Sequence, residues 1–172
     1  MKKALIVVDY QIDFVNGKLG FPGAELIENN ILDLIKTFEE NNDLIIFTKD
    51  THFNDYMSTE EGRNLPVSHC IKGTSGHELT DGLKEVVKDH LIIEKYTFPS
   101  LELGNILAKE EIDEIHLCGL VSDICVFTNA IIAKAAKPNA TIYIHKDASA
   151  SYDKDMEAMA YKVIEHLHVK VI

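Results

Sequence analysis

Short apolar runs alternate along the chain with longer amphipathic stretches, and this alternation restricts the possible folds more than any other feature of the sequence. The runs have the length of buried strands and lie at residues 4–8, 44–48, 91–93, 115–119, 141–145 and 169–172. Helical periodicity or helix-start signals mark the stretches 25–41, 100–110, 123–137 and 153–166 between them. Apolar strands that alternate with helices predict an α/β fold, a three-layer α/β/α arrangement around a doubly wound, mostly parallel sheet.

Length and charge limit the class of protein. A chain of 172 residues suits one domain, residues 1–172, with a single core. The net charge of -11 disfavours nucleic acid and membranes as partners, because both attract Lys and Arg. No apolar run approaches the roughly 18 residues of a membrane helix, and the stretch before Asp9 is too short for a signal peptide. We therefore expect a cytoplasmic protein.

One segment, residues 50–82, interrupts the alternation of strands and helices. It lacks clean periodicity, and it holds His52, His69 and His77, three of the eight histidines in the chain. A loop of about thirty residues inside a compact domain is usually functional. This segment is therefore a candidate for binding a ligand or a metal.

The predicted strands end on residues that can carry chemistry. The first strand is followed by Asp9, the second by Asp50 and His52, the third by Lys95, and the fourth by a turn that leads to Cys125. Ligands bind beyond the carboxyl ends of the strands in open parallel sheets, so these side chains should share one edge. Taken singly, the aspartate could cap a turn and the lysine could be solvated. Together they supply a base, a charge stabiliser and a nucleophile.

The three cysteines, Cys70, Cys118 and Cys125, are an odd number that gives no disulfide framework. Cys118 lies inside the fourth predicted strand, which indicates a core thiol, and Cys70 is open to either interpretation. Cys125 begins a predicted helix, where aligned backbone dipoles and unpaired N–H groups stabilise a thiolate. Position alone leaves Cys125 evenly balanced between a nucleophile and a core thiol. Asp9 and Lys95 at the same edge favour the nucleophile.

At these positions the chain resembles the isochorismatase-like cysteine hydrolase superfamily, and within it the sequence is most similar to the nicotinamidases. The resemblance covers nearly the whole chain and rests on residues 6–14 (IVVDYQIDF), 50–52 (DTH), 69–76 (HCIKGTSG), Lys95 and 119–126 (GLVSDICV). It implies an isochorismatase-like fold and hydrolysis of a small amide, with nicotinamide converted to nicotinate and ammonia as the favoured reaction.

The resemblance also implies a role for each catalytic residue. Asp9 takes the thiol proton and later gives it to the departing ammonia, while Cys125 attacks the amide carbon and forms a thioester. Lys95 holds Asp9 and favours the thiolate. A cis peptide between Leu120 and Val121 is expected, with the Val121 and Cys125 N–H groups as the oxyanion hole.

The family's metal site maps onto Asp50, His52 and His69, and Glu61 matches a fourth ligand that some nicotinamidases add. These donors suit Zn, Mn or Fe with open water positions. In nicotinamidases the metal binds the pyridine nitrogen and orients the substrate, and no organic cofactor is expected. His77 belongs to no recognised motif and is interpreted as a structural loop histidine.

The sequence departs from the nicotinamidase pattern at the expected ring contact. Nicotinamidases usually place an aromatic residue, often Trp, shortly before the metal-binding His, but residues 65–69 read LPVSH and the chain has no Trp. We expect Phe14 and Tyr96 to contact the substrate instead, whereas core packing explains Phe21 as well. This departure weakens nicotinamide as the substrate without weakening the hydrolase interpretation.

Two other functions remain open from the sequence. The first is a metal-independent relative that hydrolyses another small amide, carbamoyl or ureido compound, and the second is a non-catalytic thiol-sensing or interaction protein on the same fold. Isochorismatase itself cleaves a vinyl ether and does not need a thiol, so Cys125 argues against it. Because relatives are often dimers or tetramers, we expect a homo-oligomer whose ligand is a small-molecule amide.

Overall fold

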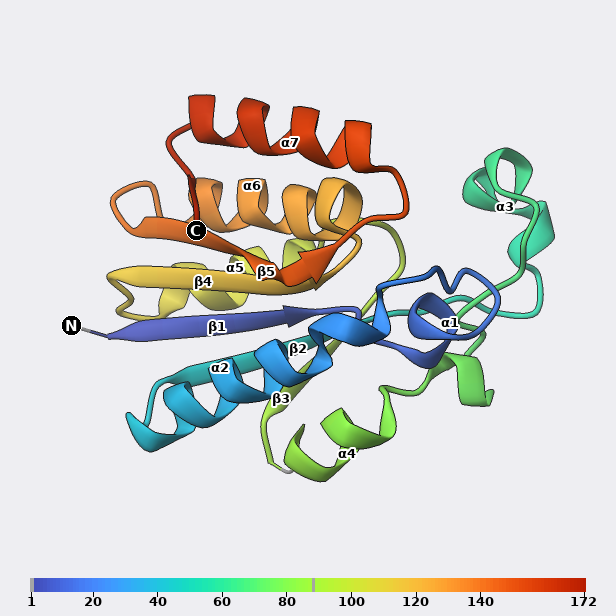
Figure 1. Ribbon diagram of the computed structural model, residues 1–172, viewed down its shortest axis with the longest axis horizontal. Coiled ribbons are helices and arrows are strands. Elements are labelled where there is room, and N and C mark those ends of the chain that lie inside the picture. Colours follow the sequence, from blue (N-terminus) through green and yellow to red (C-terminus); the bar gives the residue numbers. More distant parts are fainter. Residues whose placement is uncertain (1, 88) are drawn as a thin grey trace.

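The computed structural model describes residues 2–87 and 89–172, and within them parallel strands form one sheet (Figure 1). The strands are β1 (Lys3–Val8), β2 (Leu44–Asp50), β3 (Leu91–Lys95), β4 (Glu114–Leu120), β5 (Thr141–Ala150) and β6 (Lys170–Val171). Their order in the sheet is β3-β2-β1-β4-β5-β6, and every neighbouring pair is parallel. The predicted fold class is confirmed.

Helices cover both faces of this sheet (Figure 1). One face packs against α2 (Glu28–Glu40) and α4 (Asp81–Val87), and the other against α5 (Leu101–Lys109), α6 (Phe127–Ala136) and α7 (Lys154–His166). Helix α2 buries Ile31, Ile35 and Phe38, a spacing that places all three on one side of a helix. No helix among the described residues is long and apolar enough to cross a membrane.

The helix starts predicted from the sequence agree with the structure where a side chain caps the helix. The Ser100 hydroxyl accepts a hydrogen bond from the Leu103 N–H (3.1 Å) and the Asp153 carboxylate accepts one from the Met156 N–H (2.9 Å). The largest correction concerns β5, which the sequence predicts to end at residue 145. It continues to Ala150 because its register against β4 shifts beyond Leu117, after which Gly119 pairs with Ser149 and Leu120 with Ala150.

The segment 50–82 lies beyond the carboxyl ends of the strands, with the short helix α1 (Ile12–Val15) beside it (Figure 1). The sequence predicts no regular elements here, but the structure contains several short ones. They are 3-10 turns at Tyr56–Ser58 and Ser75–His77 and the helix α3 (Glu60–Asn64). Elements of three to five residues are too short to give a hydrophobic period, which is why the sequence pattern missed them.

Strands β1 and β4 approach each other closely where the site begins. Gly119 has φ +114°, and a Cβ atom added to it would overlap the Val8 carbonyl oxygen. Asp9, which directly follows β1, has φ +46°, in the left-handed region that L-residues seldom adopt. The expected cis peptide between Leu120 and Val121 is confirmed.

Replacement of Gly119 by Ala should destabilise the protein by about 3 kcal/mol or more, because it adds a backbone clash to an unfavourable φ. Gly23→Ala is the matched control: Gly23 also has positive φ (+98°), but no atom lies within 4 Å of the position that a Cβ would occupy, so only about 1 kcal/mol should be lost. Urea unfolding of both variants measures the difference. Equal losses would show that the contact with Val8 does not require glycine.

Candidate active site

Asp9, Lys95 and Cys125 meet at the carboxyl edge of the sheet. The Lys95 Nζ lies 2.7 Å from Asp9 Oδ2 and 3.6 Å from Cys125 Sγ. Asp9 Oδ1 accepts a hydrogen bond from the Thr48 hydroxyl (2.7 Å). Within the described residues, Asp9 Oδ2 has no hydrogen bond of good geometry despite the nearby ammonium. This oxygen therefore retains the capacity to accept a proton.

Burial controls the protonation of this set. Burial raises the pKa of Cys125 well above that of a free thiol, and the Lys95 charge opposes this rise only in part. Burial also raises the pKa of Asp9, again against Lys95. Burial acts to lower the pKa of Lys95, but the negative charges of Asp9, Cys125 and Asp50 together outweigh it and raise the pKa. Lys95 thus lowers the pKa of the thiol, as the sequence leads us to expect, while desolvation opposes the thiolate, so a base such as Asp9 is needed to take the thiol proton.

Cys125 lies in the π-helical turn Ser122–Val126, which leads directly into α6. Asn129, one turn further along, is fully buried, and its amide donates hydrogen bonds to the carbonyls of Cys125 (2.8 Å) and Phe98 (3.0 Å). Its side-chain oxygen accepts a hydrogen bond from the Ser100 N–H (3.0 Å). One amide thus joins the nucleophile turn to the segment that follows Lys95.

Asp50 connects the catalytic set to a second cluster. Its Oδ1 lies 3.2 Å from Lys95 Nζ, and its Oδ2 lies 3.0 Å from His52 Nε2 and 3.4 Å from His69 Nε2. Burial disfavours its charge, but Lys95 and then the histidines outweigh burial and lower the pKa of Asp50. Gln11 fixes the backbone of Asp50: the amide oxygen accepts from the Asp50 N–H (2.7 Å) and the amide nitrogen donates to the Asp50 carbonyl (2.9 Å).

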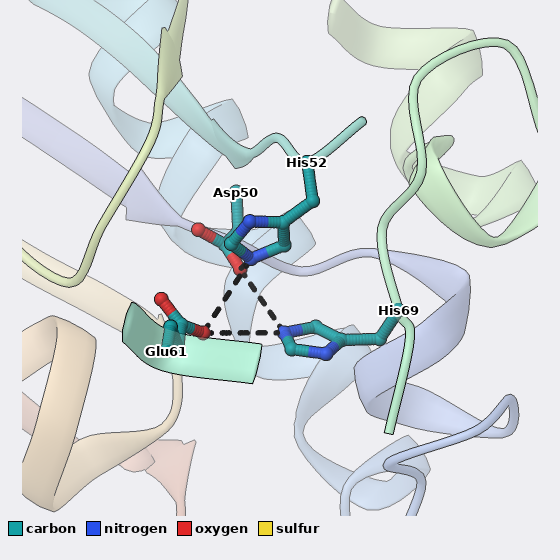
Figure 2. Close-up of side chains that lie close together, drawn as sticks. All are labelled: Asp50, His52, Glu61 and His69. Atoms are coloured by element: carbon teal, nitrogen blue, oxygen red, sulfur yellow. Dashed lines mark hydrogen bonds and ion pairs between the residues drawn. The ribbon is translucent and has the colours of Figure 1, made fainter. Parts of the chain in front are cut away.

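The four predicted metal ligands converge on one point, as Figure 2 shows. Possible ligand atoms of Asp50, His52, Glu61 and His69 all lie within 4.8 Å of one another. Glu61, the fourth residue of the set, comes from α3 and places Oε1 3.5 Å from His52 Nε2 and 3.7 Å from His69 Nε2. The structure thus brings together residues that are up to nineteen positions apart in the sequence.

The chemistry of this cluster fits a divalent transition metal. His69 places Nδ1 2.8 Å from the Val67 carbonyl, which assigns the proton to Nδ1 and leaves the Nε2 lone pair facing the cluster. The three carboxylates of Asp9, Asp50 and Glu61 face a single ammonium, so with neutral histidines two negative charges remain uncompensated. A divalent cation would balance them, and imidazole with carboxylate suits Zn, Mn or Fe.

A cavity of about 360 Å³ opens onto both clusters. Cys125 and Val121 line it together with Asp50, Glu61 and His69. Its remaining walls are mostly apolar, formed by Phe14, Leu19, Gly20, Phe21, Leu65, Phe98, Ile124 and Tyr152. A small aromatic or apolar group attached to an amide fits a cavity of this kind.

Three residues singled out from the sequence lie elsewhere. Tyr96 is 63% exposed, stacks on Phe53, and is not among the described residues that line the cavity. Its predicted substrate contact is therefore not supported, because the chain turns outward after Lys95. Cys70 and Cys118 are both fully buried, and burial raises the pKa of each thiol.

The cavity also contains residues that the sequence did not indicate. Leu65 stands in the segment where a Trp was expected, and Phe98 and Tyr152 add aromatic surface from other parts of the chain. His77 places Nε2 2.9 Å from the Thr51 hydroxyl, consistent with the structural role expected for it. Nothing in the local pattern identifies Phe98 or Tyr152, since only the fold brings them to the cavity.

A parallel sheet with a buried Asp–Lys–Cys set at its carboxyl edge is typical of the cysteine hydrolases that the sequence resembles. The chain matches the isochorismatase domain family over residues 3–172 and belongs to that family. It is 27% identical to the nicotinamidase of Saccharomyces cerevisiae, over 90% of this chain and 91% of that protein. The predicted family is thereby confirmed.

Solved structures agree with this assignment. The nicotinamidase/pyrazinamidase PncA from Bacillus subtilis is 33% identical, with a TM-score of 0.87 over 99% of both chains. Pyrazinamidase of Pyrococcus horikoshii in complex with zinc is 27% identical, with a TM-score of 0.88 over 100% of this chain and 99% of that one.

Replacement of Gln11 by Leu should lower the free energy of unfolding by about 2 kcal/mol or more, because it leaves buried backbone groups of Asp50 and His77 without partners. Asn30→Ala is the control, since its side-chain amide also donates to a backbone carbonyl, that of Asp147, but in an exposed hydrogen bond. It should cost no more than about 1 kcal/mol. Urea unfolding compares the two, and similar losses would contradict the role given to Gln11.

Proposed function

We propose that this protein hydrolyses nicotinamide to nicotinate and ammonia, with Cys125 as the nucleophile. Its class, a cysteine-nucleophile amidohydrolase, is that of its nicotinamidase relatives. The observation that carries the proposal is that one cavity presents both Cys125 and the cluster of Asp50, Glu61 and His69. An amide placed against the thiol would therefore have its ring within the same cavity as the donor cluster.

The first half of the reaction forms a thioester. Asp9 accepts the Cys125 thiol proton as the sulfur attacks the amide carbon, and the carbonyl π electrons move to oxygen. The N–H groups of Val121 and Cys125 are assigned to this oxyanion. The carbonyl then re-forms, the C–N bond breaks, and Asp9 returns its proton to the departing ammonia.

The second half releases the acid. Asp9, again a carboxylate, takes a proton from a water molecule that attacks the thioester carbon, and the C–S bond breaks. The proton held by Asp9 returns to the Cys125 thiolate, which restores the resting thiol. Lys95 stays charged throughout, because Asp9 and Asp50 surround its ammonium in a buried position. Its role is to orient Asp9 and to stabilise the transient thiolate.

Asp50, His52, His69 and Glu61 are proposed to hold a divalent transition metal. When bound, the metal would supply a Lewis acid for the pyridine nitrogen of the substrate and so orient the ring. The zinc in the Pyrococcus horikoshii relative supports this assignment. The apolar walls, with Phe14 among them, would then pack against the ring in place of the missing Trp.

A chain with Cys125 replaced by Ala should lose at least about 1,000-fold in kcat for ammonia release, because the thioester can no longer form. Cys118→Ala is the control, since this core thiol lies inside β4 and should leave kcat unchanged. Coupled ammonia detection measures both variants, and circular dichroism checks that they fold. Full activity of the Cys125 variant would refute the nucleophile assignment.

A second prediction concerns the metal. The purified wild-type protein should contain close to one equivalent of transition metal, and His69→Ala should lose most of it because a direct ligand is removed. His90→Ala is the control, because that histidine pairs with Glu39 instead. Elemental analysis gives the metal content. A metal-free wild type that releases ammonia only from other amides would favour the metal-independent alternative.

A further inference from the structure

The turn that carries the nucleophile is attached to α7 through the side chain of its first residue. Ser122, the first residue of the turn, is 1% exposed, and its hydroxyl donates a hydrogen bond to Glu157 Oε1 on α7 (2.7 Å). The contact joins segments that are thirty-five positions apart, and α7 packs along the turn.

Glu157 is suited to hold this hydroxyl firmly. Its side chain is only 14% exposed, and its second oxygen, Oε2, lies 3.0 Å from the ammonium of Lys154 at the surface. One carboxylate oxygen thus faces inward and the other outward. A hydrogen bond to a charged acceptor is roughly twice as strong as a neutral one, and a buried hydroxyl left without its partner destabilises the folded chain.

The other hydrogen bonds of the turn involve its backbone, and among them the Ser122 carbonyl accepts one from the Phe127 N–H. Within the turn, the Val121 carbonyl accepts hydrogen bonds from Ile124 (3.1 Å) and Val126 (3.2 Å). The Asn129 amide on α6 donates hydrogen bonds to the Cys125 carbonyl and to the Phe98 carbonyl, which lies between β3 and α5. These contacts hold the backbone of the turn. At its beginning, next to the N–H group assigned to the oxyanion, the Ser122 side chain is held by Glu157, and the buried Tyr161 hydroxyl of α7 lies close to both.

We propose that Glu157 is a positioning residue for catalysis: by anchoring Ser122, it fixes where the Cys125 thiol and the Val121 N–H stand relative to the substrate carbonyl. It touches no reacting atom. The proposal rests on Cys125 being the nucleophile but not on nicotinamide being the substrate. A displacement of about 1 Å at such a turn can cost up to roughly 100-fold in rate.

The test compares three substitutions on α7. Glu157→Ala should lower kcat about 10-fold to 100-fold while KM changes less than about 3-fold, since the defect lies in alignment and not in the walls of the cavity. Glu157→Gln should recover most of kcat, because its amide oxygen can still accept the hydrogen bond from Ser122. Glu165→Ala, an exposed acid on the same helix, is the matched control and should behave as wild type.

A second readout does not depend on the substrate. The rate at which iodoacetamide alkylates Cys125 is followed across pH by peptide mass spectrometry. This rate depends on the position of the thiol relative to Asp9 and Lys95. Its rate profile should change in Glu157→Ala and return in Glu157→Gln. If the wild type does not hydrolyse nicotinamide but these profiles differ as described, the substrate proposal fails and the positioning role stands.

Two outcomes would overturn the positioning role. One is a Glu157→Ala variant whose kcat and alkylation profile match those of Glu165→Ala. The other is a Glu157→Gln variant as impaired as Glu157→Ala, which would mean that the hydrogen bond to Ser122 is not what matters. Should Glu157→Ala fail to fold by circular dichroism, Ser122→Ala removes the same contact with a smaller change. It should show the same loss of kcat and the same altered profile, and wild-type behaviour there would refute the proposal.

Discussion

The buried ammonium of Lys95 is the charge on which the site depends. Its side chain is 1% exposed, and its Nζ lies 2.7 Å from Asp9 and 3.2 Å from Asp50. A lysine removed from water keeps its charge only if carboxylates replace the lost solvation, and each carboxylate in turn needs the ammonium. The geometry of Asp9 and Asp50 is therefore tied to that of Lys95, and the strands that carry them must end at the same level.

The parallel sheet satisfies this requirement. Strands β1, β2 and β3 are neighbours, and their register places Asp50 directly opposite Lys95. Strand β4, on the other side of β1, delivers the turn that carries Cys125. Because Asp50 uses one oxygen for Lys95 and the other for His52 and His69, the ammonium also orients the donor cluster. The catalytic set and the donor cluster are thus two halves of one charged network.

The sequence predicted the parts of this network that follow from strand ends. Asp9, Asp50, Lys95 and Cys125 each follow an apolar run, and parallel strands bring such positions together whatever the details of packing. The resemblance added His69 and Glu61, whose convergence depends on a segment without periodicity. The single domain, the cytoplasmic location and the homo-oligomer stay predictions, because none of them follows from contacts within the described residues.

What the sequence could not indicate are residues whose role arises from tertiary contact alone. Gln11, Asn129 and Glu157 are ordinary polar residues in the sequence, and only the folded chain shows that each binds the backbone or side chain of a site residue. Tyr96 shows the opposite case. It follows Lys95 directly, yet the strand ends there and its ring turns outward onto Phe53. Nearness in sequence to a site residue is therefore a weak guide to what lines the cavity.

Burial gives the site its reactivity and also the need for a base. The same desolvation that makes the Lys95 contacts strong raises the pKa of the Cys125 thiol, so a base is needed to take the thiol proton. The Asp9 pKa is raised by the same burial, which makes this carboxylate a stronger base than a solvated aspartate. The proton that Asp9 takes from the thiol must later be passed on to the leaving ammonia. Transfer in both directions is what a base that later protonates the leaving ammonia requires.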